Sequence, residues 1–234
     1  CGFEVSTLRG GYKEWRRLAL ATFEKKYPFI VLGGTTGSGK TQLLRSLREQ
    51  GEFIVDLEHA ARHRGSAFGS IGNEDQPTQE HFENRVAMEL LGAENAKFVW
   101  MEDESRRIGK VILPKALWEQ LWSAPVVSVT IPREQRVERL VQDYGEYSVR
   151  ELGESLQRIG RRLGPEKFRR ATEALASSDM ATVAEMCLDY YDKYYNRALQ
   201  ERTANPVIVR ECSHFDVNAL CVLLKDVVRE FRRS

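Results

Sequence analysis

The sequence lacks long hydrophobic runs and closely spaced cysteines, and both absences narrow the class of protein. No apolar stretch in the 234 residues approaches the roughly 20 residues that a membrane-spanning helix needs. The start of the sequence has neither the basic residues nor the apolar stretch of a signal peptide. The four cysteines, Cys1, Cys187, Cys212 and Cys221, lack the paired short spacings of a zinc site. We therefore expect a soluble, cytoplasmic protein with Cys187, Cys212 and Cys221 reduced and in the core.

The chain also lacks an excess of charge of either sign. Lys and Arg together number 35 and Asp and Glu 34, which gives a net charge of +1. The overall balance therefore indicates no membrane partner and no nucleic-acid partner, and any such contact requires a local patch of charge.

What the sequence does have is a repeated alternation of short apolar runs and helical patterns. Strands are predicted at 3–5, 29–32, 53–55, 98–101, 126–131 and 207–209. Helices are predicted at 12–24, from 41, at 78–91, from 114 and at 134–144. Such alternation is typical of parallel βαβ units, so we predict an α/β fold with a parallel sheet flanked by helices.

The stretch from about 149 to 200 departs from this alternation, because its pattern is helical throughout with a break at Gly164-Pro165. It forms a predicted helical insert before the last strand of the sheet. A final helix is predicted from Ser213, where the spacing Ser213-x-x-Asp216 matches a capping box.

A glycine-rich motif lies between the strand at 29–32 and the helix that follows it. Residues 34–41 match G-x-x-x-x-G-K-[ST], the phosphate-binding P-loop, so we expect a P-loop NTPase-like sheet. The glycines let backbone N–H groups turn toward phosphate oxygens, Lys40 adds a mobile positive charge, and the Thr41 hydroxyl can bind Mg²⁺. The predicted phosphate-binding residues are Gly34, Gly37, Ser38, Gly39, Lys40 and Thr41.

Carboxylates follow two of the predicted strands, where P-loop proteins place acids that bind Mg²⁺ or its water. Glu102, Asp103 and Glu104 follow one strand, and Asp56 follows another. Each is equally well explained as an ordinary acid at the end of a strand. The candidates for metal binding or general-base work are Asp56 and Glu102, and the predicted metal ligands are Thr41 and Glu102.

Several further stretches occur together in a distinctive order. They are Asp-Leu-Glu-His-Ala-Ala-Arg-His-Arg-Gly-Ser-Ala-Phe-Gly at 56–69, Gln-Pro-Thr-Gln at 76–79, Phe-Glu-Asn at 82–84, Glu-Asp-Glu-Ser-Arg-Arg-Ile-Gly at 102–109, Arg-Leu-Gly at 162–164 and Tyr-Asp-Lys-Tyr-Tyr at 191–195. With the P-loop, these motifs resemble the P-loop domain of the tRNA 2-selenouridine synthases over residues 27–195. The run at 63–69 is the most specific of them.

The head of the sequence is similar to the last strand and helix of a rhodanese domain, which precedes the P-loop domain in this family. The resemblance rests on Gly-Phe-Glu-Val at 2–5 and on Gly-Gly-Tyr-Lys-x-Trp-Arg at 10–16. Cys1 does not match the loop that carries the nucleophilic cysteine of the family. We therefore expect residues 1–26 to be the C-terminal tail of a rhodanese-like domain and residues 27–234 to be the P-loop domain. The rest of the rhodanese domain is then supplied upstream, supplied by a separate chain, or lost.

The resemblance implies a transferase that modifies the wobble uridine of certain tRNAs. Enzymes of this family replace the sulfur of 2-thiouridine with selenium from selenophosphate, through an S-geranylated intermediate made from geranyl diphosphate. A P-loop suits this chemistry, because Lys40 and Mg²⁺ stabilise a diphosphate leaving group as its C–O bond breaks. We therefore expect tRNA, geranyl diphosphate and selenophosphate as substrates, Mg²⁺ as cofactor and Lys40 as a catalytic residue.

Basic residues in two places are candidates for contact with the tRNA. Arg62, His63 and Arg64 can bind the anticodon loop or a second phosphate, although His63 also fits a structural histidine. A second set lies in the predicted insert: Arg158, Arg161, Arg162, Lys167, Arg169 and Arg170. From the residues alone, this set and the repeat Arg133, Arg136, Arg139 are better explained as solvated helix faces. The family resemblance instead favours contact between the set in the insert and the RNA backbone. Trp100, Trp118 and Trp122 fit core packing better than the wall of a geranyl or base pocket.

Two other functions fit the same residues. A small-molecule or nucleoside kinase shares the P-loop, the alternating architecture and an arginine-bearing helical insert, and would turn over ATP. A non-catalytic tRNA-binding domain would bind tRNA in a salt-dependent way whether or not geranyl diphosphate is present.

Overall fold

The computed structural model describes residue 4, residues 6–202 and residues 207–230. The strand predicted at 3–5 rests on residues outside these ranges. In chain order the elements are α1 (Gly11–Glu24), β1 (Phe29–Gly34), α2 (Lys40–Glu49), β2 (Phe53–Val55), α3 (Leu57–Ala61), α4 (Gln79–Leu91), β3 (Val99–Glu102), β4 (Arg107–Ile108), β5 (Val111–Ile112), α5 (Lys115–Trp122), β6 (Val126–Thr130), α6 (Arg133–Tyr144), α7 (Val149–Leu163), α8 (Pro165–Ala176), α9 (Met180–Glu201), β7 (Val207–Glu211) and α10 (Val217–Glu230).

Five strands form one parallel sheet in the order β2-β3-β1-β6-β7, which confirms the predicted α/β fold. The central strand β1 pairs Phe29 with Val99 of β3 and Val31 with Val126 of β6. The chain runs outward from β1 to β2, returns to β3, and then crosses β1 to reach β6. The direction of travel therefore reverses between β1 and β3, and ligands of open α/β sheets bind at the carboxyl ends of the strands beside such a reversal.

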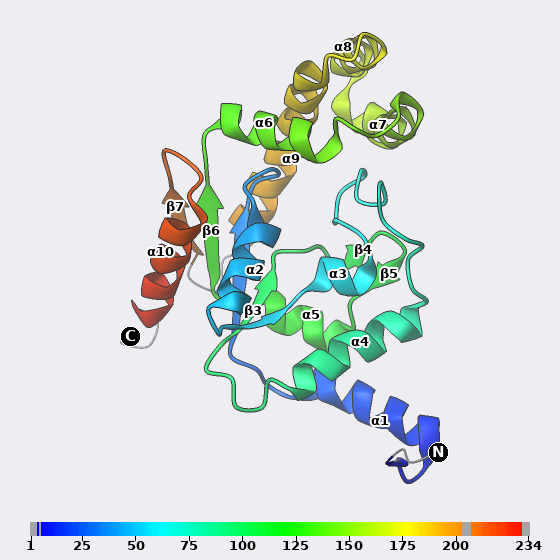
Figure 1. Cartoon of the computed structure of the whole chain (residues 1–234), viewed down its shortest axis with the longest axis vertical. Helices are drawn as coiled ribbons and strands as arrows, with labels where there is room; N and C mark the ends of the chain where they lie inside the picture. The colour runs from blue at the N-terminus through cyan, green and yellow to red at the C-terminus, as the bar shows by residue number, and fades with distance from the viewer. Residues whose placement is uncertain (1–3, 5, 203–206, 231–234) are drawn as a thin grey trace.

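Helices cover both faces of the sheet (Figure 1). Successive strand residues point to opposite faces, so Val31 and Val99 pack with α1, α3, α4 and α5, whereas Ile30 and Trp100 pack with α2 and α10. Trp100 is 0% exposed, which confirms that it is a core residue. Cys187 and Cys221 are also buried, and Cys212 is half-buried with a free thiol.

The predicted insert is present as α7, α8 and α9 between β6 and β7, and it stands at the top of Figure 1. The three helices share a core of their own, with Leu156 and Leu175 among its members. The break at Gly164-Pro165 is confirmed, and a second break precedes Asp179, whose carboxylate caps α9 by accepting the Thr182 N–H. Phe68 from the segment between α3 and α4 joins this core, so that segment is anchored to the insert.

The predicted start of the last helix is wrong. α10 begins at Val217, and Asp216 rather than Ser213 caps it, by accepting the N–H groups of Asn218 and Ala219 at 2.9 and 3.0 Å. The residues before Asp216 cannot join the helix because Gln135 of α6 holds their backbone: its amide donates to Ser213 O and accepts the Phe215 N–H.

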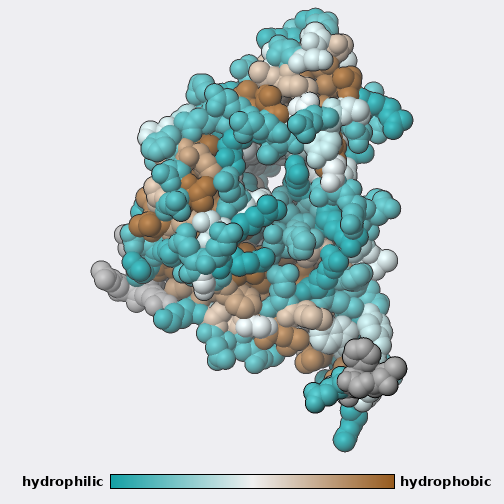
Figure 2. Space-filling view, viewed as in Figure 1, coloured by the Kyte–Doolittle hydropathy of each residue, from teal (hydrophilic) through white to brown (hydrophobic). Residues whose placement is uncertain are grey.

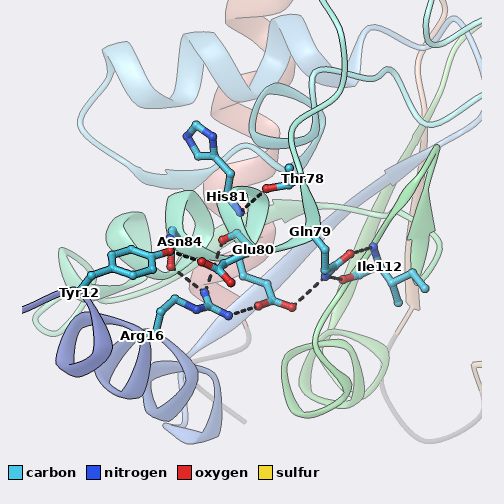
Figure 3. Close-up of polar contacts among 9 residues, drawn as sticks. Tyr12, Arg16, Thr78, Gln79, Glu80, His81, Asn84 and Ile112 are labelled. Carbon is cyan, nitrogen blue, oxygen red and sulfur yellow. Dashed lines mark hydrogen bonds and ion pairs between the residues drawn. The ribbon is translucent and has the colours of Figure 1, made fainter.

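Helix α1 is packed against α4 by a polar network (Figure 3). The Arg16 guanidinium donates to Glu83 and Asn84, both at 2.6 Å, and the Tyr12 hydroxyl donates to Glu80. Phe23 at the end of α1 is buried in the same core as α4 and α5. The boundary at residue 26 stays a prediction, and α1 forms part of the hydrophobic core beneath the sheet. Across the described residues, no helix has the length and apolar character required to span a membrane.

Candidate functional site

The P-loop lies at the carboxyl end of β1 and opens into a cleft of about 1040 Å³. The cleft lies between the edge of the sheet and the helical insert, and Figure 2 shows a largely hydrophilic hollow there. Its lining comes from the P-loop, α3, residues 62–66 and 72–74, residues 103–105, α6 and α9. The insert therefore covers the edge of the sheet at which ligands of α/β proteins bind.

The P-loop has the backbone geometry of a phosphate cradle. Gly37 and Gly39 both have φ of 80°, a left-handed conformation that glycine adopts without strain. A side chain at Gly34 would lie 2.5 Å from Ser38 Oγ, so the loop closes only with glycine there. Lys40 Nζ donates to Gly34 O at 2.7 Å, so the positive charge of Lys40 lies over the loop. The Ser38 hydroxyl is buried and has no hydrogen-bond partner among the described residues.

Helices α6 and α9 hold the P-loop from outside. The Tyr195 hydroxyl accepts the Gly34 N–H at 2.6 Å and bonds Ser128 Oγ at 2.9 Å. Arg136 donates to Thr36 O at 3.3 Å and to both oxygens of Asp192 at 2.7 and 2.8 Å. Because Arg136 is 6% exposed, it is neither part of a solvated helix face nor open to RNA, and both alternatives for it are wrong.

The acids that lie beside the P-loop include Glu104, which was considered from the sequence but not chosen, and Glu58, which sequence reasoning missed. Glu58 Oε2 accepts the Thr41 hydroxyl at 3.2 Å, and the Glu58 N–H donates to Glu102 Oε2 at 3.2 Å. Asp56 also lines the cleft, where its carboxylate caps α3 through the His59 N–H at 2.8 Å. Glu58 stands in the first turn of a five-residue helix that sequence periodicity does not reveal. The signal that could have found it was its place two residues after Asp56, in the family-like stretch at 56–69.

Burial of these acids disfavours their charged forms. Burial raises the pKa of Glu104 to about 8, and the neighbouring Glu58 carboxylate adds to the shift. The pKa of Glu102 is raised well above its usual range, first by burial and then by the charges of Glu58 and Asp56. Burial also raises the pKa of Glu58, although the Lys40 charge opposes that shift. The cleft therefore holds in Glu104 a carboxyl group that carries a proton near neutral pH beside the phosphate-binding loop, whereas Glu102 is buried outside the cleft lining.

Glu104→Gln is expected to make the protein less sensitive to pH. Between pH 4.5 and about 8 the unfolded Glu104 loses its proton while the folded one keeps it, so the free energy of unfolding falls as pH rises. Glutamine removes this contribution, so we expect the variant to gain about 3 kcal/mol relative to the parent between pH 5 and pH 8. Urea unfolding of both proteins at pH 5 and at pH 8 measures this difference in the free energy of unfolding. If the free energies of unfolding of the two proteins differ by the same amount at both pH values, the prediction is wrong.

The structure brings one predicted RNA-binding group into the cleft and leaves the other outside it. Arg62, His63 and Arg64 line the cleft beside the P-loop. His63 is 8% exposed, and burial followed by the Arg158 charge lowers its pKa, which favours its structural reading. The second group is exposed on α7 and α8 outside the cleft lining, and consists of Arg161, Arg162, Arg169 and Arg170. Arg169 pairs with Glu166 and Glu173 on its own helix. RNA contact stays a prediction for all of them.

Tyrosines rather than tryptophans form the aromatic part of the cleft. Tyr144 of α6 and Tyr191 and Tyr194 of α9 line it, together with Leu140. Trp118 and Trp122 stack on each other in α5, with ring centroids 5.3 Å apart. The tyrosines give the insert side of the cleft a surface on which a flat or apolar group can pack.

The residues at the P-loop fit Mg²⁺ bound together with a phosphate ligand. No group of three or more His, Cys, Asp or Glu side chains in the described ranges is arranged to hold a metal ion by itself. Thr41 and Glu58 offer a hydroxyl ligand and a carboxylate within 3.2 Å of each other. Mg²⁺ is commonly bound by few protein ligands plus phosphate oxygens and water, so Thr41 would bind the ion and Glu58 one of its waters.

Comparison with known proteins decides the family. Residues 27–220 match the model of the tRNA 2-selenouridine synthase AAA domain. Curated tRNA 2-selenouridine synthases from Salmonella newport (strain SL254) and Salmonella heidelberg (strain SL476) are 37% identical over 88% of this chain. The chain belongs to the tRNA 2-selenouridine synthase family. It spans 65% of the length of these two relatives.

Three of the motifs on which the family resemblance rested meet at the cleft. Segments 56–69, 102–109 and 191–195 each contribute residues to its lining, although they are far apart in the sequence. Both the P-loop and these parts of the cleft lining lie within the range that matches the family model. A crystal structure of TT1252 from Thermus thermophilus covers 88% of this chain and 98% of its own, with 20% identity and a TM-score of 0.43.

Proposed function

We propose that this domain transfers the geranyl group of geranyl diphosphate to the sulfur of a 2-thiouridine in tRNA. The observation that carries the proposal is a P-loop that opens into a cleft whose lining is built from the motifs of a tRNA 2-selenouridine synthase family. The selenium of selenophosphate would then attack C2 of the S-geranylated uridine, geranylthiol would leave with the sulfur, and water would cleave the Se–P bond and release phosphate.

The groups at the P-loop have separate roles in the transfer. Backbone N–H groups of the loop and Lys40 hold the diphosphate, and Thr41 would hold an Mg²⁺ ion, which would neutralise part of its charge. The C–O bond to the geranyl carbon breaks, the S–C bond forms, pyrophosphate leaves and the uridine loses its N3 proton. Glu58 lies in the same cleft beside Lys40, whose charge favours the ionised form of the carboxyl group, and its carboxylate can accept that proton.

The proposal is tested with an anticodon stem-loop RNA that carries 2-thiouridine. Incubation with geranyl diphosphate and Mg²⁺ is expected to add one geranyl group per RNA, measured by mass spectrometry, and to release pyrophosphate. The same RNA with uridine in place of 2-thiouridine is the control and should stay unmodified. If ATP is hydrolysed or phosphorylates the RNA while geranyl diphosphate is inert, the domain is a kinase and the proposal is wrong.

A further inference from the structure

Five arginines line the cleft, and three of them have partners within its lining. These three contacts are Arg62 with Glu74, Arg64 with the Tyr144 ring, and Arg139 with Gln42. The other two, Arg45 and Arg85, make no hydrogen bond or ion pair with any residue that the structure describes. We call Arg45 and Arg85 the unpaired arginines.

The unpaired arginines lie on either side of β2, the edge strand of the sheet. Arg45 comes one turn after Thr41 on α2, so its side chain is on the Thr41 side of that helix. Ile54 of β2 shares a core with α2, whereas Val55 shares a core with α4, the helix that carries Arg85, on the opposite face of the sheet. The two guanidinium groups therefore reach the cleft from both faces of the sheet.

Arg85 is half-buried, and nothing within the described ranges accepts a hydrogen bond from its guanidinium. Glu89 stands one turn later on α4, but its carboxylate accepts the Asp56 N–H at 3.4 Å and does not pair with Arg85. Removing part of a charged group from water costs free energy unless an acceptor replaces the water. An anion bound in the cleft would supply that acceptor.

The cleft lining is more positive than the protein as a whole, whose net charge is +1. Lys40 and the five arginines line it, together with six acids. Among these acids, Asp103 is neutralised by Arg202 from outside the lining, and burial raises the pKa of Glu104 to about 8, so Glu104 carries a proton at neutral pH. The other four acids therefore face six cations, which is the local patch of charge that a polyanion requires.

The positions of the unpaired arginines fit an extended anion. The P-loop amides and Lys40 already provide for a diphosphate, whereas Arg45 lies farther along α2 and Arg85 lies on a different helix. One guanidinium can bind two oxygens of one phosphate, so two guanidinium groups from opposite faces of the sheet suit successive phosphates of a chain. The phosphodiester backbone of RNA is such a chain.

We propose that Arg45 and Arg85 bind the phosphodiester backbone of the RNA where it enters the cleft beside β2, and so hold the modified uridine near the P-loop. This inference rests on the proposed function, which makes an RNA the substrate. It places the RNA backbone in the cleft and not on the exposed arginines of α7 and α8, where Arg169 already pairs with Glu166 and Glu173.

The test measures binding of the 2-thiouridine stem-loop by fluorescence anisotropy, without geranyl diphosphate, in about 50 to about 300 mM KCl. Each phosphate contact that is lost lowers the slope of log Kd against log[KCl] by about 0.7–0.9. Arg45→Ala/Arg85→Ala is therefore expected to lower the slope by about 1.5 and to weaken binding at least about tenfold at about 100 mM KCl. Because phosphates carry no sequence information, the uridine control RNA should lose the same factor.

Two further double variants sharpen the test. Arg45→Lys/Arg85→Lys keeps both charges and should retain the parent's slope, which separates loss of charge from loss of the fold. Arg161→Ala/Arg170→Ala tests the rival location, because these arginines are exposed on α7 and α8 outside the cleft lining, and it should change the slope by less than about 0.5. Pyrophosphate affinity, measured by calorimetry with Mg²⁺, should fall less than about threefold in Arg45→Ala/Arg85→Ala, because the P-loop holds the diphosphate.

Three results overturn the proposal. The first is a slope in Arg45→Ala/Arg85→Ala equal to that of the parent. The second is a loss of affinity confined to the 2-thiouridine RNA, which indicates contact with the base. The third is a pyrophosphate affinity that falls as much as the RNA affinity, because the two arginines then serve the diphosphate. Failure of the proposed function is distinct, since the RNA then binds with the expected salt dependence but receives no geranyl group.

Discussion

Replacing Lys40 with alanine is expected to lower geranyl transfer to thiolated RNA by at least about 100-fold. The leaving diphosphate gains negative charge as the C–O bond breaks, and Lys40 is the loop residue whose full positive charge stands over that position, 2.7 Å from Gly34 O. Its effect should be larger on the transfer rate than on RNA binding, since the charge is needed most in the transition state. The rate of geranyl transfer under single-turnover conditions and the Kd for RNA, measured on the same samples, give the two effects.

The matched control for this substitution is Lys115→Ala. Lys115 is an exposed lysine at the start of α5 that pairs only loosely with Glu119, at 3.6 Å, so its loss should leave transfer intact. Circular dichroism and thermal unfolding of the two variants check that the fold is kept. If Lys40→Ala transfers geranyl at the rate of Lys115→Ala, the P-loop does not bind the leaving group.

The fold was predictable because its signals are local. Each strand of the parallel sheet is a short apolar run, and the P-loop motif fixes what lies on either side of β1. Pro165 and the preceding Gly164 marked the break between α7 and α8 because proline removes a helical N–H and glycine relieves the turn. The short elements β4, β5 and α3 were not predicted, because they have two to five residues and, unlike the strands of the main sheet, are not continuous apolar runs.

Only the part of the site that lies within one contiguous motif was predictable from the sequence. The loop from Gly34 to Thr41 was found as a contiguous pattern, whereas Tyr195 reaches the Gly34 N–H across 161 positions of sequence. Such contacts depend on how the insert folds back over the sheet. The sequence of α9 itself gives no signal of which distant residue each side chain contacts. The charge pattern of α6 was likewise misleading. Its arginines repeat as they would on a solvated face, but Arg136 is buried by α9 and neutralised by Asp192.

The contact between α6 and α9 leads to the largest expected loss of stability. Asp192→Ala removes the partner of Arg136, whose side chain is 7% exposed, and leaves its guanidinium buried with Thr36 O as its remaining acceptor. Removing one member of a buried ion pair costs about 3–5 kcal/mol, and the 21% exposure of Asp192 places the expected value near about 3 kcal/mol. Urea unfolding at neutral pH measures the change in the free energy of unfolding.

Asp189→Ala, one turn earlier on α9, is the control within the same helix. Asp189 pairs with Arg133 and Lys167, but all three side chains are between 31% and 45% exposed, so its loss should cost no more than about 1 kcal/mol. Arg136 also donates to the P-loop at Thr36 O, and Gly37 packs against its backbone, so Asp192→Ala should weaken pyrophosphate binding while Asp189→Ala does not. Equal losses of stability in the two variants would mean that α9 contributes general packing and does not hold the phosphate loop through Arg136.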